Sequence, residues 1–280
     1  MISIIVCSVN PGLLQALKKN ITETIGIISY EILGIDNSVE NLGISKIYNY
    51  GLERAKYPFI LCVHEDICFR TTMWGQILLN YFEENSQLGL IGIAGSKVKT
   101  KTPNGWWENE PDNWVMNLIQ HYKNGKVEKI QRGFADDLEE VVVIDGVFLA
   151  LRKDSEIKFD ERIRGFHNYD QSISIRYRLA GYKIMVTREI LIEHFSSGAK
   201  DPSWLISNRH FFTLYKQHLP QSVRNNRVSK EEVTYSYLRL INNLKREHKL
   251  NAMFYWLNYW RWNPMEKKTY RLDISDRFVP

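Results

Sequence analysis

Hydrophobic and polar positions form two kinds of pattern along the first third of the chain. Short runs of consecutive apolar and β-branched residues are typical of strands buried on both faces of a parallel sheet, and apolar residues spaced three and four apart are typical of helices. The strand pattern occurs at Ile2–Val9, Glu31–Ile35 and Pro58–Val63, with the helix pattern between them at Leu13–Ile21 and Gly43–Ala55. This order predicts right-handed crossovers and a parallel sheet.

The middle of the chain is less regular. Met73–Phe82 has helical spacing and Leu88–Ala94 is another apolar strand, but the stretch from Gly95 to about Leu138 has no clear period. A segment this long inside a compact domain is more often a functional loop region than a linker. The pattern then predicts a helix and four strands, at Asp170–Ala180 and at Glu140–Ile144, Gly146–Arg152, Tyr182–Val186 and Glu189–Glu193.

From about Asp201 the chain has the pattern of helices rich in aromatic residues. Ser229–Glu232 has the S-x-x-E form of a capping box in front of Val233–Leu244. We therefore expect an α/β protein with a mostly parallel sheet flanked by helices over residues 1–200. A helical, aromatic-rich C-terminal extension over residues 201–280 is expected to pack on it.

Composition narrows the class of protein. The 280 residues are 44% hydrophobic and 25% charged, as in an ordinary globular domain. The 37 basic and 32 acidic residues give a net charge of +5, scattered along the chain, so we expect no nucleic-acid partner. The cysteines Cys7, Cys62 and Cys68 have no CxxC spacing, which argues against a disulfide framework or a structural zinc site and favours a reducing cytoplasm.

Polar residues follow each of the first three predicted strands. Asn10, Asp36 and Asp66 stand just after these strands, and ligands of open α/β sheets bind at the carboxyl ends of strands. If the backbone at His64-Glu65-Asp66 stays extended, His64 and Asp66 face one way and Glu65 the other. An imidazole beside a carboxylate is a half-site for a divalent cation, although acidic residues at a strand end also simply solvate turns.

Other candidates have two interpretations each. His194 should end its strand on the same sheet edge as Asp66, but a lone histidine is commonly structural. Asp170 lies where a helix begins, as a general base or as a cap. Asp145-Gly146 interrupts an apolar run, and either Asp145 is a carboxylate with a functional role or the two residues form a tight turn between strands. The irregular middle also holds tryptophans, which either stack on sugars or nucleobases or anchor loops, namely Trp106, Trp107 and Trp114.

The order of these segments resembles the family-2 glycosyltransferases of the glycosyltransferase A fold. Asp36-Asn37-Ser38 is similar to the family's nucleobase-holding segment, and Gly43–Gly51 matches its helix motif G-x-x-x-x-x-N-x-G. His64-Glu65-Asp66 takes the place of the metal-binding D-x-D. Val143–Arg152 resembles the acceptor-side segment, and Gly165–Asp170 the segment that carries the catalytic base.

The resemblance implies an inverting, metal-dependent glycosyltransferase, with Mn²⁺ or Mg²⁺ held by Asp66 and His194 and with Asp170 as the base. The donor would be a nucleotide-diphosphate sugar, most commonly a UDP-sugar in this family, and the acceptor a glycan or lipid-linked saccharide. Residues implied to contact the nucleotide sugar are Asn10, Asp36, Lys46, Asn49, His64 and Glu65. Those implied on the donor-sugar or acceptor side are Trp106, Trp107, Asp145, Gly146 and His167.

Two positions depart from the family pattern. His64 replaces the first aspartate of D-x-D, and Tyr169 replaces the glutamate before Asp170. These departures leave open a catalytically degenerate protein that binds carbohydrate or nucleotide. A sugar nucleotidyltransferase is the other alternative, but Asn10-Pro11-Gly12 lacks the Gly-rich, basic loop that such enzymes use on triphosphates.

The C-terminal region contains a short aromatic segment, Leu250–Trp260, between Lys249 and Arg261. It is about half of the ~20 residues that a spanning helix needs. The segment either packs on the α/β domain, which we favour, or lies in a membrane interface. We thus expect a cytoplasmic protein, with peripheral contact at the inner face of the membrane in the second case.

Overall fold

The protein is described from a computed structural model over residues 1–196 and 202–247. The helices are α1 (Pro11–Thr24), α2 (Ile44–Arg54), α3 (Trp74–Glu84), α4 (Tyr169–Leu179), α5 (Pro202–Tyr215) and α6 (Lys230–Glu247), with short 3₁₀ turns at Pro111–Asn113 and Lys216–His218. The strands are β1 (Ile2–Ser8), β2 (Tyr30–Asp36), β3 (Phe59–Val63), β4 (Ile67–Phe69), β5 (Leu88–Gly92), β6 (Ala94–Ser96), β7 (Val98–Lys99), β8 (Trp114–His121), β9 (Val127–Arg132), β10 (Leu138–Glu140), β11 (Val143–Ile144), β12 (Phe148–Arg152), β13 (Lys183–Thr187), β14 (Ile192–His194) and β15 (Gln221–Ser222).

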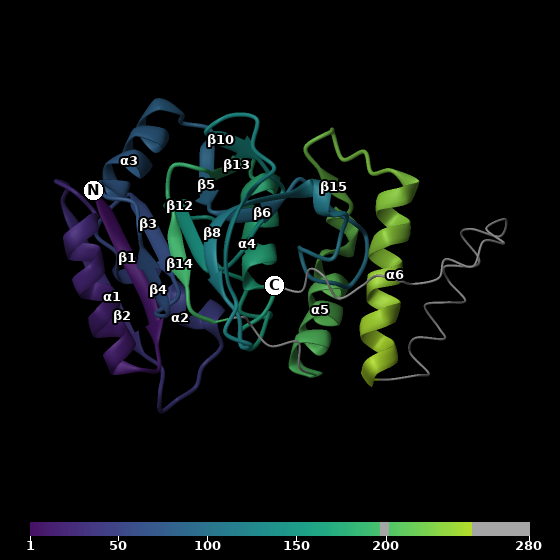
Figure 1. The fold of residues 1–280 in the computed structure, drawn as a ribbon, viewed down its shortest axis with the longest axis horizontal. Coiled ribbons are helices and arrows are strands. Elements are labelled where there is room, and N and C mark those ends of the chain that lie inside the picture. The colour runs from purple at the N-terminus through teal and green to yellow at the C-terminus, as the bar shows by residue number, and fades with distance from the viewer. Residues whose placement is uncertain (197–201, 248–280) are drawn as a thin grey trace, which may run out of the picture.

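The central sheet has the order β10-β13-β5-β12-β3-β1-β2 (Figure 1). Strand β1 pairs in parallel with β2 and β3, and β5 pairs in parallel with β13. The α/β class is as expected, but the sheet is mixed rather than mostly parallel, because β12 runs antiparallel to both β3 and β5. Phe148 pairs with Val63, so β12 enters the sheet at the carboxyl end of β3 and runs back along it.

A second sheet has the order β11-β6-β8-β14-β4 with β9 paired to β8, and its strands β8 and β9 lie in the region that the sequence predicted to be irregular. Strands β8 and β9 form an antiparallel hairpin over Met116–His121 and Val127–Arg132. The expectation of a long loop between Gly95 and Leu138 was therefore wrong. The reason is that β8 is buried on both faces over Trp114–Leu118, which removes the polar and apolar alternation that identifies a strand.

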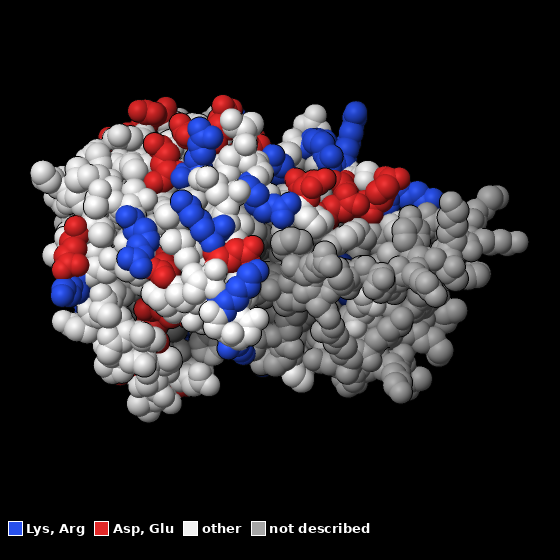
Figure 2. Space-filling view, viewed as in Figure 1, with Lys and Arg blue, Asp and Glu red and all other residues white. Residues whose placement is uncertain are grey.

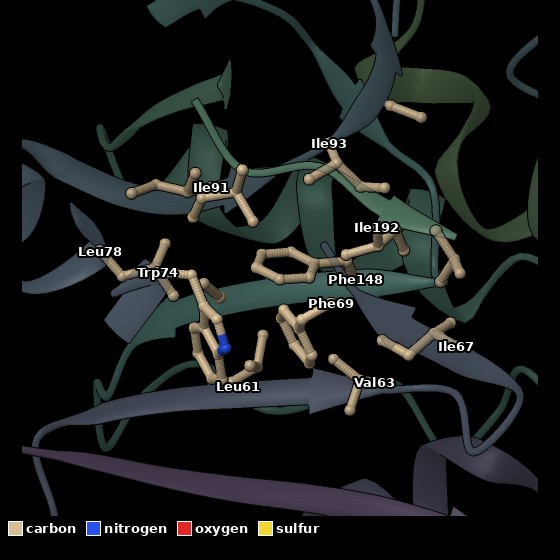
Figure 3. Close-up of a cluster of buried hydrophobic side chains, with 14 of the residues drawn as sticks. Leu61, Val63, Ile67, Phe69, Trp74, Leu78, Ile91, Ile93, Phe148 and Ile192 are labelled. Carbon is tan, nitrogen blue, oxygen red and sulfur yellow. The ribbon is translucent and has the colours of Figure 1, made fainter. Parts of the chain in front are cut away.

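The main core fills the space between the two sheets (Figure 3). Phe69 on β4 stacks on Trp74 of α3 with ring centroids 4.1 Å apart, and Phe148 on β12 meets the edge of Phe69. Leu61 and Val63 of β3 are also part of this cluster. This packing holds the carboxyl end of β3 against the second sheet, which positions the residues that follow Val63.

The described part of the extension packs on the α/β part. Trp204 and Leu205 of α5 form a small core with Leu240 and Leu244 of α6, against which Trp107 packs. In Figure 1 both helices lie at the end of the molecule away from α1. No helix among the described residues is long and apolar enough to cross a membrane. The aromatic segment at residues 250–260 lies outside the described residues.

Charge is mixed on one face of the molecule. On the face drawn in Figure 2, basic and acidic side chains are interspersed over the α/β part. Among the described residues drawn on that face, no continuous basic strip of the kind that tracks a nucleic-acid backbone is seen.

Candidate active site

Three chain segments meet at the carboxyl edge of β3. The amide of His64 donates to the carbonyl of Val147, which joins the segment after β3 to the turn before β12. The amide of Phe195 donates to the carbonyl of Asp66, which joins the same segment to the end of β14. Residues far apart in sequence are thereby brought to one edge of the sheet.

His64, Asp66 and His194 form a group that could hold a metal ion, with ligand atoms all within 4.8 Å of one another. Asp66 Oδ1 lies 3.8 Å from His64 Nδ1 and 3.7 Å from His194 Nε2. Burial by itself would raise the pKa of Asp66, but the two histidines and Ser196 hold it below its ordinary value. One carboxylate and two imidazoles make a donor set that suits a divalent transition-metal ion.

Gln120 on β8 orients His194. Its amide nitrogen donates to the carbonyls of His121 and Ser196, which leaves Oε1 to accept from His194 Nδ1 at 3.1 Å. With its proton on Nδ1, the imidazole presents the lone pair of Nε2 toward Asp66. Burial and the neighbouring His64 lower the pKa of His194, which favours the neutral form that binds metals.

Tyr169 holds His64 in the same way from the other side. The Tyr169 hydroxyl lies 2.8 Å from His64 Nε2, so Nδ1 is the nitrogen left facing Asp66. The same hydroxyl also explains Gly146, because a Cβ at position 146 would lie 2.0 Å from it. The two residues that depart from the family pattern, His64 and Tyr169, are thus joined by a hydrogen bond.

Asp170 is a buried carboxyl group beside Asp145. It accepts hydrogen bonds from the amides of Gly146 at 3.2 Å and Gln171 at 2.8 Å. Burial, together with the negative charge of Asp145, raises the pKa of Asp170 to about 7. A carboxyl group with a pKa near neutrality is suited to accept and release a proton during catalysis.

Asp145 is held from two sides. Its carboxylate accepts from Trp106 Nε1 at 2.8 Å and from the amide of Val147 at 2.9 Å. The bond to Val147 belongs to the tight turn between β11 and β12, so both interpretations of Asp145-Gly146 apply to the same residues. The turn places the negative charge next to Asp170.

Most of these side chains, although not Asp66, line a cavity of about 240 Å³, which we call the inner cavity. Of the residues expected to act on the donor sugar, acceptor or metal, those that line it are His64, Trp106, Trp107, Asp145, Gly146, His167, Asp170 and His194. The sequence analysis gave no site role to other residues that line it, including Gln120, Phe166, Tyr169 and Gln171. Gln120 stands out only once β8 is known, as a polar side chain within a largely buried strand.

Asn10 and Glu65 lie at the end of β1, outside the lining of the inner cavity. Glu65 accepts from Ser8 Oγ at 2.6 Å and from the amides of Val9 and Asn10 at 3.2 Å each. The Asn10 side chain caps α1 by accepting from the amides of Gly12 and Leu13. The side chains of Asn10 and Glu65 thus both make hydrogen bonds within the fold. Glu65 thus bonds to the end of β1, whereas Asp66 lies beside the two histidines, and the backbone bends at both residues instead of continuing as a strand.

The other residues expected to contact the nucleotide are spread along β2 and α2. Asp36 is the exposed last residue of β2 and accepts from the amide of Ser38, and the hydrogen bonds from Ser38 lower the pKa of Asp36. Lys46 is exposed on α2, while Asn49 is buried and clamps the backbone of Phe159 in both directions. Nucleotide contact therefore stays a prediction for Asp36 and Lys46, whereas the Asn49 amide is engaged within the fold.

The family follows from comparison with known sequences. A model of a family described as "Glycosyltransferase like family" matches residues 3–225. The chain belongs to this family. The match includes the metal-ligand group, Asp145 and Asp170, so the expected kinship with sugar-transferring enzymes is confirmed. No curated protein sequence gives a significant match.

Solved structures agree on the fold of this glycosyltransferase-like chain. A structure of S. aureus TarS 1–349 in complex with UDP-GlcNAc superposes with a TM-score of 0.52 at 13% identity, covering 92% of this chain and 79% of that one. A longer TarS structure gives 0.51 at 14% identity, covering 92% and 47%. GalNAc-T7 with UDP, GalNAc and Mn²⁺ gives 0.48 at 8% identity, covering 91% of this chain and 58% of that one. The two TarS superpositions confirm the expected glycosyltransferase A fold.

Proposed function

We propose that the protein is an inverting glycosyltransferase that moves a sugar from a UDP-sugar to an acceptor hydroxyl, with the help of a divalent metal ion. The observation that carries the proposal is that two residues of the candidate metal group, His64 and His194, line the same cavity as the buried carboxyl group of Asp170. TarS, which shares the fold, binds UDP-GlcNAc, and this supports UDP as the nucleotide.

In this proposal the residues divide the work between donor and acceptor. Asp66, His64 and His194 hold the metal ion, which when bound neutralises the diphosphate of the leaving group. Asp170 accepts the proton of the acceptor hydroxyl as that oxygen attacks the anomeric carbon from the face opposite the diphosphate, which inverts the configuration.

The donor set favours Mn²⁺ over Mg²⁺. Mg²⁺ binds mainly through carboxylate and water oxygens, whereas two of the three protein ligands here are imidazole nitrogens. With His64 in place of the first aspartate of D-x-D, the site can thus still bind a metal ion, and it favours Mn²⁺ over Mg²⁺.

The rival function of a sugar nucleotidyltransferase has a specific observation against it. Such enzymes cradle a triphosphate on the amides of the loop after β1. Here the Glu65 carboxylate occupies the amides of Val9 and Asn10 and puts a negative charge where the phosphates would lie.

Calorimetric titration of metal and UDP tests the proposal. Mn²⁺ should bind at least ~10-fold more tightly than Mg²⁺, equivalent to about 1.4 kcal/mol, and should be required for UDP binding. Asp66→Ala should abolish Mn²⁺-dependent UDP binding while the protein stays folded.

Glu65→Ala is the matched control for Asp66→Ala. It removes a neighbouring carboxylate that faces Ser8, so it should retain metal binding even if it loosens the loop after β1. UDP binding that needs no metal, or equal losses in the two variants, would contradict the proposed site.

A further inference from the structure

A second cavity of about 330 Å³ lies beside the inner cavity, and we call it the outer cavity. Its walls include Trp106, Trp107 and Met116, which also line the inner cavity, together with Trp114 and Tyr122. The remaining lining comes from one strand, residues 128–132 of β9. Its volume falls within the range of small-molecule sites, and the mechanism proposed above leaves it unused.

The floor of the two cavities is one continuous face of the second sheet. On β8 the residues Met116, Leu118 and Gln120 alternate onto this face and line the inner cavity. The register of the hairpin places Arg132 opposite Met116, Ile130 opposite Leu118 and Glu128 opposite Gln120. Because paired residues of adjacent strands share a face, the floor extends from β8 onto β9.

One of these rows includes His194 of the candidate metal group. Strand β14 pairs in parallel with β8, with His194 beside Gln120 and Ile192 beside Leu118. The row that starts at His194 therefore crosses Gln120 and ends at Glu128. Two strand spacings separate β14 from β9, roughly 10 Å, which is about the reach of two linked sugar rings.

The lining of the outer cavity suits a sugar ring. Tyr122 and the tryptophans supply flat apolar faces, and Glu128 and Arg132 supply hydrogen-bond acceptors and donors of opposite charge. Arg132 is held in place over the ring of Trp114 and by the carbonyl of Pro111. Rigid aromatic walls with a few fixed polar groups are typical of sites that bind small polar ligands.

We propose that the outer cavity binds the second sugar of the acceptor, so that the acceptor is an oligosaccharide of at least two rings. This inference rests on the proposed function, because it takes the acceptor hydroxyl to lie in the inner cavity beside Asp170. The ring next to the reacting sugar then lies past the Trp106–Trp107 wall, on the floor formed by Ile130 and Arg132.

The test is binding to an array of printed glycans, from mono- to tetrasaccharides of common hexoses and N-acetylhexosamines, in the presence of UDP and Mn²⁺. The wild-type protein should bind at least one printed oligosaccharide ~10-fold or more tightly than the matching monosaccharide, a difference of about 1.4 kcal/mol. Ile130→Trp fills the outer cavity and should abolish this preference for the longer chain.

Val127→Trp is the matched control, because Val127 is exposed on the opposite face of the same strand and pairs with His121. It should keep the preference. Should Ile130→Trp fail to fold, as judged by its melting curve, Tyr122→Ala takes its place and should lower oligosaccharide binding by a similar factor. Absence of binding to every printed glycan, equal binding of mono- and oligosaccharides, or an Ile130→Trp or Tyr122→Ala variant that matches Val127→Trp would overturn the inference.

The UDP titration separates this inference from the proposed function. UDP binding without oligosaccharide binding would overturn the outer site and leave the proposed function standing. Oligosaccharide binding that Ile130→Trp removes, in a protein that does not bind UDP, would support the glycan site and overturn the transferase.

Discussion

At the scale of single residues, the site is organised by pairs of side chains. His64 and Tyr169 occupy two positions at which this chain departs from the family pattern, and the Tyr169 hydroxyl lies 2.8 Å from His64 Nε2. A glutamate at position 169 and an aspartate at position 64 would repel each other at that distance. The two departures thus form one compatible pair, and neither by itself indicates a degenerate site.

Tyr169→Phe tests this pairing. The variant keeps the ring packed against Tyr48 and Phe159 and removes only the hydroxyl. Because partners of a metal-binding histidine contribute roughly 10-fold to 100-fold to metal affinity, the dissociation constant for Mn²⁺ measured by calorimetry should rise at least ~10-fold. The exposed Tyr50→Phe should leave it unchanged. Unaltered affinity in Tyr169→Phe would show that the hydroxyl does not position His64.

Asp170→Asn tests the environment of the base through stability. The pKa of Asp170 in the folded protein is about 7, above its ordinary value of 3.8, so the stability that its protonated form gives is lost as the pH rises through 7. In calorimetry, the melting temperature of Asp170→Asn minus that of the wild type should therefore be more positive at pH 8 than at pH 5.

Asp36→Asn serves as a control of opposite sign, because hydrogen bonds from Ser38 lower the pKa of Asp36. Asparagine at position 36 should give no gain in stability at pH 8. A melting difference for Asp170→Asn that is independent of pH would mean that the raised pKa is absent.

At the scale of elements, the sequence predicted the helices and strands whose pattern depends on one buried face or one short apolar run. The first three strands and the helices between them occur within two or three residues of their expected ends. The hairpin of β8 and β9 was missed because β8 is buried on both faces and β9 is a partly exposed edge strand. Its register, and hence the role of Gln120, depends on pairing across the sheet.

The candidate site was predictable where it depends on strand ends. The carboxyl-edge argument brought Asp66 and His194 together, and they lie 3.7 Å apart. What the sequence could not provide is the set of partners. Neither Tyr169 against His64 nor Trp106 against Asp145 follows from spacing, because each pair joins segments separated by the folded chain.

Gly51→Ala tests why the family motif on α2 ends in glycine. A Cβ at position 51 would lie 2.5 Å from Ile5 Cγ2, so α2 packs directly on β1 at this point. Overpacking of this kind costs about 1–3 kcal/mol, and urea unfolding should show a loss in this range. Ser38→Ala is the control, because Ser38 is exposed and its substitution should cost much less. Gly125→Ala would be a poor control, because Gly125 has a positive φ. A neutral Gly51→Ala would mean that α2 and β1 have room to separate.

At the scale of the whole molecule, the extension helps to form the wall of the site. Trp204 on α5 lines the inner cavity and stacks with Trp107, and Ser207 of the same helix accepts from Asn168, just before Asp170. The Ser207 hydroxyl also donates to the carbonyl of His167. The position of the base segment thus depends on α5 as well as on the sheet.

Trp204→Ala should therefore destabilise the protein and disturb the cavity together. Loss of a buried tryptophan costs about 3–5 kcal/mol, to be measured as the free energy of unfolding in urea. Ile206→Ala on the same helix is the control, since its side chain is 68% exposed and its loss should cost little. Equal costs for the two variants would show that α5 does not pack on the α/β part through Trp204.

The most direct test of the account is release of UDP from a panel of UDP-sugars, in the presence of Mn²⁺, by the wild-type protein and by Asp170→Asn. The account predicts that the wild type releases UDP from at least one donor when acceptor is present. Asp170→Asn should bind UDP normally and transfer the sugar ~10²–10⁴-fold more slowly, as is typical when a general base is removed. No release by the wild type from any UDP-sugar, or transfer by Asp170→Asn at the wild-type rate, would contradict it.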